Sequence, residues 1–473
     1  MPEQQPGVAV IGGGVAGLAT AWHLENPADG ARCNCRVTVF EAASTAGGNL
    51  RTEEAEGFRV EWGPNGFLDS EPATLELARA IGLGPDLLRS RDTARRRFLY
   101  VRGRLREIPD TPARFVKSDL FSPGAKLRIA GEIAVPARRD LGLAAERLET
   151  DETVWAFGAR RLGRAFADTM LDPMVRGITG GECRRVSLAA AFPRMVELEQ
   201  RYGGLFRALI ALRRHRRRQP GAATGGPTGV LTSFTGGMSR LPHALLAGLR
   251  GEVLTGRPVS SLASTTAGWT VTAAGRRYGP FAAIVDAAPA HAAAVYHPHA
   301  DARTLLAGIR YNPLVVIGGA WRRDDVPHPL DGFGMLTPSS EGSPLLGVLW
   351  DSSIWDHRAP AGAILLRAMV GDPAWLDRDD ADIVNQVAGE FEKIFGIVRK
   401  PLQYWIFRHK MAIAEYEVGH LARLARLDRI LAETPGLFLT GSSYRGIAVN
   451  HCLKDAVRVA DAVRAYLERG GNA

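Results

Sequence analysis

The chain has 473 residues, enough for two or three domains with substantial hydrophobic cores, and its hydrophobic fraction of 46% is that of a globular protein. The formal net charge of +9 permits contact with anionic lipids, polyanionic substrates or nucleic acids. No uninterrupted apolar run is long enough to span a membrane, and the N-terminal residues lack the basic region of a secretory signal peptide.

The first predicted elements are an apolar strand and a glycine-rich turn. Residues 8–11 are apolar, residues 12–17 read GGGVAG, and apolar residues then recur at helical intervals. In this context glycines let a pyrophosphate approach backbone N–H groups at the N-terminus of a helix. A second strand over 36–40 ends at Glu41, whose carboxylate can accept a hydrogen bond from a ribose hydroxyl. The pattern predicts a dinucleotide site and leaves flavin and nicotinamide both open.

A second glycine turn follows and bears on the kind of dinucleotide. Gly47 and Gly48 come shortly after Glu41, and the stretch 60–66 reads VEWGPNG. A nicotinamide dehydrogenase does not need a second turn that exposes its backbone here. The arrangement Glu-x5-Gly-Gly resembles the N-terminus of the flavin amine oxidase superfamily, in which this turn lets the chain lie against the diphosphate and the flavin. Flavin adenine dinucleotide (FAD) is therefore the favoured ligand.

The remaining pattern predicts an α/β protein with a discontinuous cofactor domain. Helical periodicity over most of 97–229 predicts a helical insertion, with a Gly/Pro/Thr-rich loop over 219–228. Strand-like segments follow, including a hairpin, and we expect them to extend the first sheet. Mixed strands with a helix over about 380–395 predict a substrate-binding domain with a mixed sheet. The Rossmann-like FAD-binding domain would then comprise 1–96, 230–300 and 404–473, the helical insertion 97–229 and the substrate domain 301–403.

The C-terminal segment predicts a short strand, a glycine turn and a helix from about Asn450. The N-terminus of a helix carries about half a positive charge. Beside a flavin, that charge can stabilise the anionic reduced ring and favour hydride acceptance.

Seven stretches in the same order resemble the protoporphyrinogen/coproporphyrinogen oxidase family, over nearly the whole chain. They are VEWGPNGFLDSEPATLELARAIGL, RRRFLYVRGRLREIP, LDPMVRGITGGECRRVSLAAAFPRMVELE, SFTGGMSRLP, DGFGMLTPSSE, LLGVLWDSS and GSSYRGIAVNHC. The resemblance implies an amine-oxidase-like architecture and heme biosynthesis as the setting.

The resemblance also implies roles for individual residues. Arg97 would pair with a substrate propionate through its bidentate guanidinium. The pocket would be lined by Gly334, Leu336, Leu349 and Met369. The residues implied to bind FAD are Gly12, Gly13, Gly14, Val15, Ala16, Gly17, Glu41, Ala42, Gly48, Asn49, Gly63, Pro64, Asn65, Gly66, Val259, Gly441, Ile447, Ala448 and Val449.

The implied chemistry needs few acids or bases from the protein. The methylene bridges of a porphyrinogen, protoporphyrinogen IX or coproporphyrinogen III, would give hydride to flavin N5, and dioxygen would reoxidise the flavin and yield hydrogen peroxide. No side chain is assigned as catalytic. The helical insertion corresponds to the membrane-facing domain of the family, which implies peripheral attachment to the inner face of the cell membrane. The resemblance leaves a homodimer open.

Departures from the family pattern leave a second function open. Residues 409–416 read HKMAIAEY where relatives commonly carry Trp-Pro and then Ile-Pro-Gln-Tyr, and Ser442 and His451 replace an asparagine and an aspartate. The alternative is a related FAD oxidase or dehydrogenase that acts on another apolar, specialised metabolite.

The four cysteines indicate a reducing, cytoplasmic setting. They are too few and too scattered for a disulfide framework and lack partners at metal-site spacing, so we expect no bound metal. The basic charge alone would permit a nucleic-acid-binding protein, but the chain has no recognisable base-stacking or helix-turn-helix module. We therefore expect no nucleic-acid partner.

Overall fold

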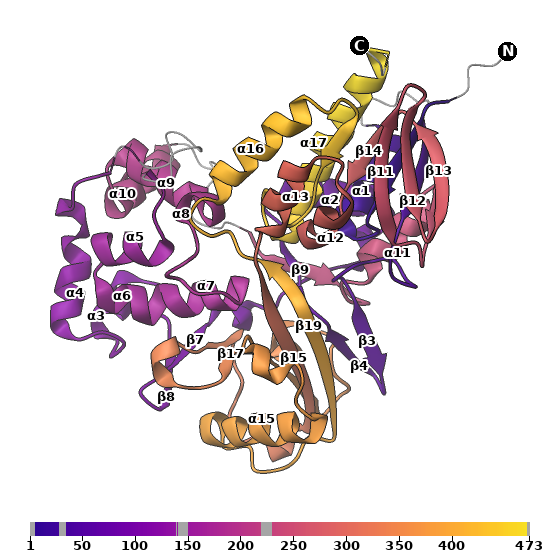
Figure 1. Cartoon of the computed structure of the whole chain (residues 1–473). Coiled ribbons are helices and arrows are strands. Elements are labelled where there is room, and N and C mark those ends of the chain that lie inside the picture. The colour runs from indigo at the N-terminus through magenta and orange to yellow at the C-terminus, as the bar shows by residue number, and fades with distance from the viewer. Residues whose placement is uncertain (1–4, 28–34, 139, 141–149, 219–228, 471–473) are drawn as a thin grey trace.

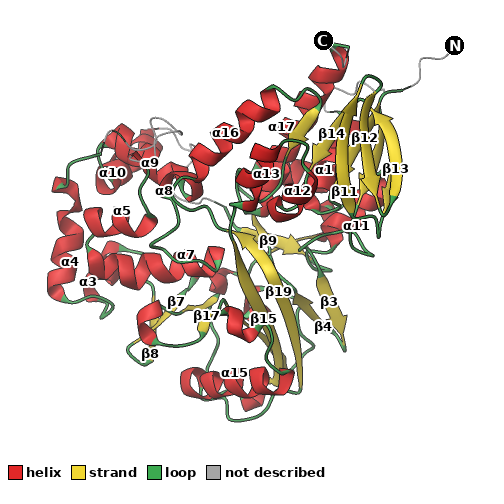
Figure 2. Ribbon diagram, viewed as in Figure 1, coloured by secondary structure: helices red, strands yellow, loops and turns green. Residues whose placement is uncertain are grey.

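The structure is a computed structural model that describes residues 5–27, 35–138, 140, 150–218 and 229–470. Figure 1 shows three regions. A parallel sheet with helices α1 (Val15–Glu25) and α17 (Val449–Glu468) lies near both termini, a helical region lies at the other end, and a long twisted sheet carries α15 (Asp380–Phe395). Figure 2 shows that strands are concentrated in the first and third regions. The predicted α/β class is confirmed.

The first region is built on a five-stranded parallel sheet in the order β10-β2-β1-β14-β20. Its strands are β1 (Gly7–Ile11), β2 (Arg36–Phe40), β10 (Glu252–Leu254), β14 (Ala283–Asp286) and β20 (Leu437–Leu439). The central strands are buried on both faces, as is usual for parallel sheets covered on both sides. Helices α1 and α17 cover one face, and α12 (Ala290–Tyr296), α13 (Ala300–Ala307) and α16 (His420–Ala432) lie toward the other.

The expectation that the following hairpin extends this sheet is wrong. Strands β11 (Val259–Thr265), β12 (Gly268–Ala273) and β13 (Arg276–Phe281) form a separate three-stranded antiparallel sheet. In β12 buried residues alternate with half-buried ones, and the buried Trp269 and Val271 pack in the same cluster as Ala9 and Ile284 of the parallel sheet. A strand inside a covered parallel sheet needs apolar residues on both faces. Because β12 is apolar on one face, it lies in a second layer instead.

The third region is a seven-stranded sheet in the order β19-β15-β18-β17-β16-β7-β8. Its strands are β7 (Phe98–Val101), β8 (Arg104–Glu107), β15 (Tyr311–Arg322), β16 (Gly334–Leu336), β17 (Leu345–Leu349), β18 (Ala363–Val370) and β19 (Gln403–Ala414). Ile317 and Trp321 on one face pack against Phe391 of α15. On the other face Val316 and Phe407 pack against the hairpin of β3 (Thr52–Ala55) and β4 (Phe58–Glu61).

This sheet contains strands from outside the interval expected for the substrate domain. β7 and β8 fall within 97–229, and β19 falls within 404–473. β7 joins the sheet because Phe98 and Leu99 pair in parallel with Met335 and Leu336, far along the chain. Local periodicity carries no signal for such a pairing.

The short elements that complete the first and third regions connect the larger sheets. They are β3 (Thr52–Ala55), β4 (Phe58–Glu61), β5 (Phe67–Leu68), α2 (Pro72–Ala80), β6 (Leu87–Arg89), β9 (Leu231–Phe234), α11 (Arg240–Gly248) and α14 (Asp351–Ile354).

The described residues of the second region, between β8 and β9, contain α-helices, a turn of 3-10 helix over Gly131–Ala134 and a turn of π-helix over Ala167–Leu171. Its helices are α3 (Pro112–Lys117), α4 (Pro123–Ala130), α5 (Val154–Arg161), α6 (Arg164–Phe166), α7 (Asp172–Thr179), α8 (Leu188–Ala191), α9 (Pro193–Tyr202) and α10 (Leu205–Arg218). The loop expected over 219–228 lies outside the described residues. Across the part of the chain that the structure describes, no helix is both long and apolar enough to cross a membrane.

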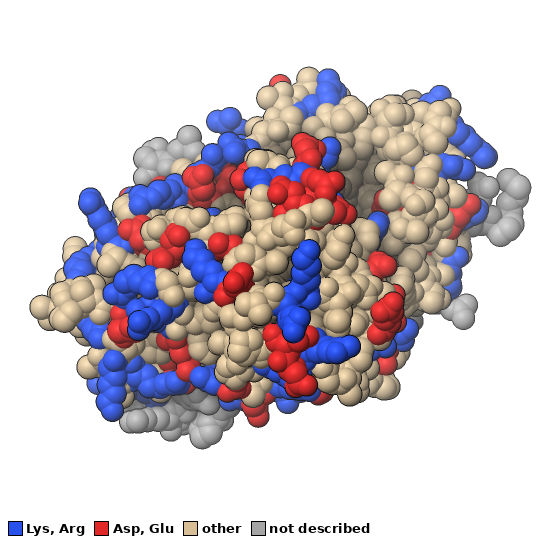
Figure 3. Space-filling model, turned by 90° about the horizontal axis from the view of Figure 1, so that it is seen from below, with Lys and Arg blue, Asp and Glu red and all other residues tan. Residues whose placement is uncertain are grey.

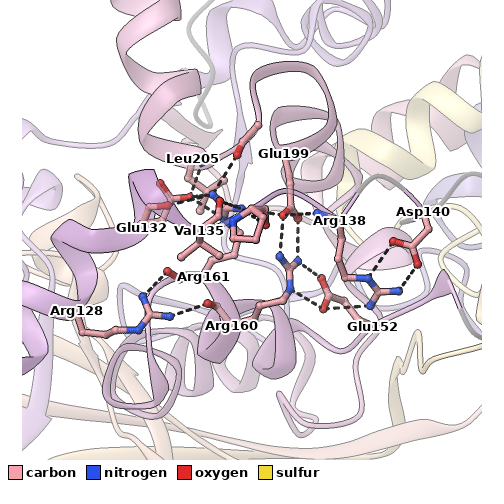
Figure 4. A network of polar contacts seen from close by, with 12 residues as sticks. Arg128, Glu132, Val135, Arg138, Asp140, Glu152, Arg160, Arg161, Glu199 and Leu205 are labelled. Atoms are coloured by element: carbon pink, nitrogen blue, oxygen red, sulfur yellow. Dashed lines mark hydrogen bonds and ion pairs between the residues drawn. The ribbon is translucent and has the colours of Figure 1, made fainter.

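Buried ion pairs hold the helical region together (Figure 4). Arg161 is fully buried, and its guanidinium donates to Glu132 (Nε to Oε1, 2.7 Å) and to Glu199 (Nη1 to Oε1, 2.9 Å). Arg160 joins Glu199 to Glu152, and Glu132 also accepts the N–H of Leu205 at the start of α10 (2.8 Å). Four helical segments therefore meet at one set of fully or largely buried charges.

Candidate cofactor and substrate site

The three glycines of the first turn differ in what surrounds them. Gly12 has φ +98°, and a Cβ atom there would lie 3.0 Å from the backbone of Ala287. A Cβ at Gly17 would lie 2.0 Å from the Gly12 oxygen, so both glycines are required by packing. A Cβ at Gly14 would contact only the Gly48 Cα, at 4.0 Å, and the backbone there is extended. Open space therefore lies beside Gly14 at the uncapped N-terminus of α1, where backbone N–H groups can bind a diphosphate.

Glu41 lies at the end of β2 and joins three segments. Its Oε2 accepts the N–H of Gly13 (2.7 Å), and its Oε1 accepts the N–H of Ala43 (2.8 Å). Each carboxylate oxygen keeps a lone pair for a ribose hydroxyl. The Arg257 N–H donates to the Glu41 backbone oxygen (2.8 Å), which brings the start of β11 and the half-buried Val259 next to this position. Ala42, which lies between Glu41 and Ala43 in the chain, is exposed.

The second glycine turn lies directly against the first. The Gly47 N–H donates to the Gly13 oxygen (2.8 Å), and a Cβ at Gly48 would lie 3.0 Å from the Gly14 Cα. Asn49 follows on the surface. The two backbones can approach this closely only because both carry glycine, so the open space beside Gly14 is bordered by backbone from both turns.

The loop over residues 63–66 contributes an amide without a partner. Both side-chain amide atoms of Asn65 are buried, and neither has a hydrogen-bond partner among the described residues. A Cβ at Gly63 would meet only the Asn49 oxygen, at 3.3 Å, whereas one at Gly66 would lie 2.5 Å from the Thr232 oxygen. A buried amide without partners is costly unless a ligand supplies them, and an amide can both donate to and accept from the ring of a flavin. Pro64 is half-buried between these residues.

The C-terminal turn returns to the same place. Gly441 has φ +111°, and a Cβ there would lie 3.9 Å from the Ala16 Cβ in the first turn of α1, next to the half-buried Val15. Helix α17 begins at Val449, and Ala448 caps it without a side-chain hydrogen bond. Ile447 is half-buried, whereas Ala448 is exposed. The expected helix is confirmed, and segments from both ends of the chain meet around the open space beside Gly14. These observations fit a dinucleotide held by backbone groups.

A buried arginine joins the long sheet to this site. Arg367 of β18 donates from Nη1 to the backbone oxygens of Glu61 (3.0 Å) and Gly63 (2.8 Å), and its Nε donates to Asp351 (2.8 Å). Burial raises the pKa of the Glu61 carboxyl, although Arg358 beside it acts in the opposite direction. We did not predict these residues. The sequence feature that could have indicated Arg367 is its position as the single charged residue in the apolar run AILLRAMV.

The expected substrate residues share the sheet face that Arg367 occupies. Leu349 pairs with Gly334 on one side and with Arg367 on the other, and Gly347 pairs with Leu336 and Met369. Directly paired residues, and residues two apart on a strand, project from the same face. Because Arg367 Nη1 donates to the backbone oxygens of Glu61 and Gly63, this sheet face lies beside the loop over 63–66.

Arg97 lies at the edge of this apolar face. It is exposed, and its guanidinium carbon is 5.3 Å from the centre of the Phe333 ring, which packs in the same cluster as Leu349. Arg97 has no carboxylate partner among the described residues, whereas Arg96 forms ion pairs with Glu107 and Asp331. The guanidinium of Arg97 therefore lies beside the apolar residues and is free to pair with a carboxylate of a ligand, whereas the guanidinium of Arg96 is already paired.

The altered segment over 409–416 lies partly on the same face. His409 Nε2 lies 3.0 Å from the Trp62 oxygen, and burial lowers the pKa of His409. Glu415 is turned away, because its Oε1 accepts the Glu182 N–H (3.3 Å) from the helical region. Burial raises the pKa of Glu415, with Arg185 acting against it. The Ser442 oxygen accepts a hydrogen bond from Tyr416, and the His451 residue is exposed.

Comparison with known proteins covers nearly the whole chain. A family model described as flavin-containing amine oxidoreductase matches residues 15–464. The chain is 25% identical over 480 residues to coproporphyrinogen III oxidase of Bacillus subtilis, across 99% of this chain and 100% of the relative. It is 30% identical over 491 residues to protoporphyrinogen oxidase of Homo sapiens, across 96% and 98%. A solved structure from Exiguobacterium sp. 255-15, provisionally assigned as protoporphyrinogen oxidase, has a TM-score of 0.81 at 23% identity and covers 97% of this chain and 99% of that one.

Proposed function

Because the chain belongs to the protoporphyrinogen/coproporphyrinogen oxidase family of flavin-containing amine oxidoreductases, we propose that it oxidises a porphyrinogen to the porphyrin in heme biosynthesis. It is an FAD-dependent oxidoreductase. The substrate would be protoporphyrinogen IX or coproporphyrinogen III, and dioxygen would be the acceptor. The observation that carries the proposal is the apolar sheet face that lies beside the loop over 63–66 and has a free guanidinium at its edge.

Bound FAD would supply the hydride acceptor at flavin N5, and dioxygen would be the final electron acceptor with hydrogen peroxide as the product. The residues of the chain bind and orient. The glycine turns and the N-terminus of α1 hold the diphosphate, and Glu41 holds the ribose. Leu336, Leu349 and Met369 contact the flat tetrapyrrole and exclude water from it. Arg97 pairs with a propionate and fixes which edge of the macrocycle enters.

Replacing Arg97 by alanine is expected to weaken substrate binding by about 1–3 kcal/mol, because a charge-assisted hydrogen bond to a carboxylate is lost. The KM for coproporphyrinogen III or protoporphyrinogen IX, measured by porphyrin fluorescence and peroxide release in air, should rise by roughly five- to hundredfold. Arg95→Ala is the matched control, since Arg95 is exposed and pairs with Asp92 (3.0 Å). An unchanged KM in Arg97→Ala would reject the role of Arg97.

A second candidate function is oxidation of another apolar, specialised metabolite by the same FAD site. His409 favours it, because two-residue spacing on β19 puts this imidazole on the same face as Phe407, next to Trp62. A polar group at that position changes what the apolar face can accept. Turnover of neither porphyrinogen by an FAD-loaded protein would support this candidate.

We also propose peripheral attachment of the helical region to anionic lipid at the inner face of the cell membrane. Val116 of α3 is 68% exposed and Leu127 of α4 is 75% exposed, and Lys117 is exposed next to Val116. On the face shown in Figure 3, basic and acidic side chains lie mixed, so charge alone does not mark one patch. Exposed apolar side chains flanked by basic residues suit insertion at the headgroup level.

Flotation with vesicles of acidic lipid is expected to retain the protein at low salt, and less of it as salt screens the basic residues. The double variant Val116→Asp with Leu127→Asp should lose most of the retained fraction. Val398→Asp is the control, because Val398 is 72% exposed and lies just beyond α15, in the third region. Protein that stays in solution at every ionic strength would contradict the attachment.

The oligomeric state is a separate question. Sedimentation of the lipid-free protein distinguishes a monomer from a homodimer.

A further inference from the structure

The turn over residues 441–446, which connects β20 to α17, is held by a side chain from outside it. Tyr416 donates its O–H to the backbone oxygen of Ser442 (2.8 Å). The same phenol oxygen accepts the N–H of Gly446 (2.8 Å). One phenol oxygen therefore joins both ends of the turn. Gly446 has φ +134° and stands just before the residues that start α17.

His420 supports this arrangement from α16. Its ring stacks on the Tyr416 ring, with centres 4.0 Å apart and planes 12° apart. Its Nε2 lies 2.8 Å from the Tyr444 oxygen, and since a carbonyl only accepts, Nε2 carries the proton. Burial lowers the pKa of His420 to about 4, so the ring is neutral at ordinary pH. Tyr416 and His420 together bond three backbone groups of the turn.

Tyr416 is itself fixed. It lies two residues beyond the end of β19 and is buried, and its backbone oxygen accepts the Ser187 N–H (2.8 Å) from the helical region. Burial raises the pKa of Tyr416, so its O–H remains a donor. The residue thus links the long sheet, the helical region and the turn, and it is rigid enough to set where the turn lies.

The position of the turn decides where α17 begins. Ala448 caps α17 without a side-chain hydrogen bond, so the free N–H groups of the first helical turn are available to a ligand. Their partial positive charge acts within about one turn of the helix end. A shift of the helix start would therefore change how strongly it stabilises negative charge on a reduced flavin.

We propose that Tyr416, supported by His420, is a positioning residue that holds the N-terminus of α17 at the flavin and thereby sets the flavin's reduction potential. The inference rests on FAD binding and not on the porphyrinogen. The potential can be measured without a substrate, so its outcome is independent of whether a porphyrinogen is oxidised.

The test compares two variants that each remove one oxygen atom from the same neighbourhood. Tyr416→Phe loses both hydrogen bonds to the turn. Tyr444→Phe is the matched control, because Tyr444 is buried in the turn itself and its Oη has no hydrogen-bond partner among the described residues. The readout is the midpoint potential of the bound flavin in the full-length protein, measured by equilibration with a reference dye, together with FAD content and melting temperature.

Tyr416→Phe is expected to keep FAD and to lower the potential by at least about 30 mV, which corresponds to a tenfold change in the two-electron equilibrium. Tyr444→Phe should leave the potential unchanged. If Tyr416→Phe fails to retain FAD, His420→Phe replaces it as the test variant. His420→Phe keeps the ring stack but loses the hydrogen bond to the backbone oxygen of Tyr444, so it should also lower the potential. A wild-type potential in the FAD-loaded variant, or an equal change in the Tyr444→Phe control, would overturn the proposal.

Discussion

Gly14→Ala should yield a folded protein that binds FAD at least about tenfold more weakly, a loss of about 1.4 kcal/mol or more. The added methyl group would occupy the space beside Gly14 where the diphosphate approaches the N-terminus of α1. The fold itself should tolerate alanine, because its Cβ would contact one atom at 4.0 Å and the backbone at Gly14 has φ −75° and ψ 176°. Alanine adopts that conformation readily.

Two other glycine variants make the comparison specific. Gly17→Ala should destabilise the apoprotein, since its Cβ would lie 2.0 Å from the Gly12 oxygen. Gly389→Ala in α15 should reduce neither the affinity for FAD nor the stability of the apoprotein, because a Cβ there meets nothing within 4 Å and alanine favours a helix. Affinity is measured by calorimetric titration of apoprotein with FAD, and folding by circular dichroism. Wild-type affinity in Gly14→Ala would reject the assignment of this space to the diphosphate.

Arg161→Met is expected to loosen the helical region by about 3–5 kcal/mol. Removing Arg161 leaves the fully buried Glu132 without its ion-pair partner, and the buried Glu199 keeps only Arg160. Amide hydrogen exchange in α5, α9 and α10 should accelerate by a factor on the order of a hundred to a few thousand. Exchange is the suitable measurement because a chain with several regions need not unfold in two states.

Arg194→Met is the matched control, because Arg194 is an exposed residue of α9 whose partner Glu197 is also exposed. Such surface pairs contribute little. Equal exchange in the two variants would show that the buried network does not stabilise the region.

Glu199 gives the network a pH dependence. Burial raises its pKa, but the hydrogen bond and charge of Arg160 outweigh burial and hold the pKa below the usual 4.5. Since the folded pKa is lower than the unfolded one, Glu199 contributes stability that is complete above the unfolded value and is lost as the pH falls through the folded value. Exchange in the helical region should therefore accelerate below about pH 4.5 in the wild type, and less so in Glu199→Gln.

The sequence allowed the cofactor turn to be predicted because its signals are short-range. The glycine spacing, the apolar strand before it and the helical pattern after it all lie within about twenty residues, and Glu41 follows the next strand. The same signals could not separate the roles of the glycines. Gly12 and Gly17 are required by contacts with Ala287 and with each other, whereas Gly14 faces open space, and only the three-dimensional neighbours distinguish them.

The links between regions could not be predicted, because they join residues that are far apart in the chain. Arg367 and Glu61 are 306 positions apart, and their hydrogen bond has no counterpart in local periodicity. The same holds for β7, whose strand pattern gives no indication that its neighbour is β16. Tyr416 stands in a segment that departs from the family pattern, yet its contact with the C-terminal turn became apparent only when the strands were placed.

The central claim is that FAD, held by segments from both ends of the chain, faces a sheet that presents a porphyrinogen to it. Anaerobic mixing of the FAD-loaded protein with coproporphyrinogen III and, separately, with protoporphyrinogen IX tests this claim most directly. We expect one of them to bleach the blue flavin absorption band at a rate at least equal to turnover in air. A flavin that stays oxidised with both, while a chemical reductant still bleaches it, would contradict the claim.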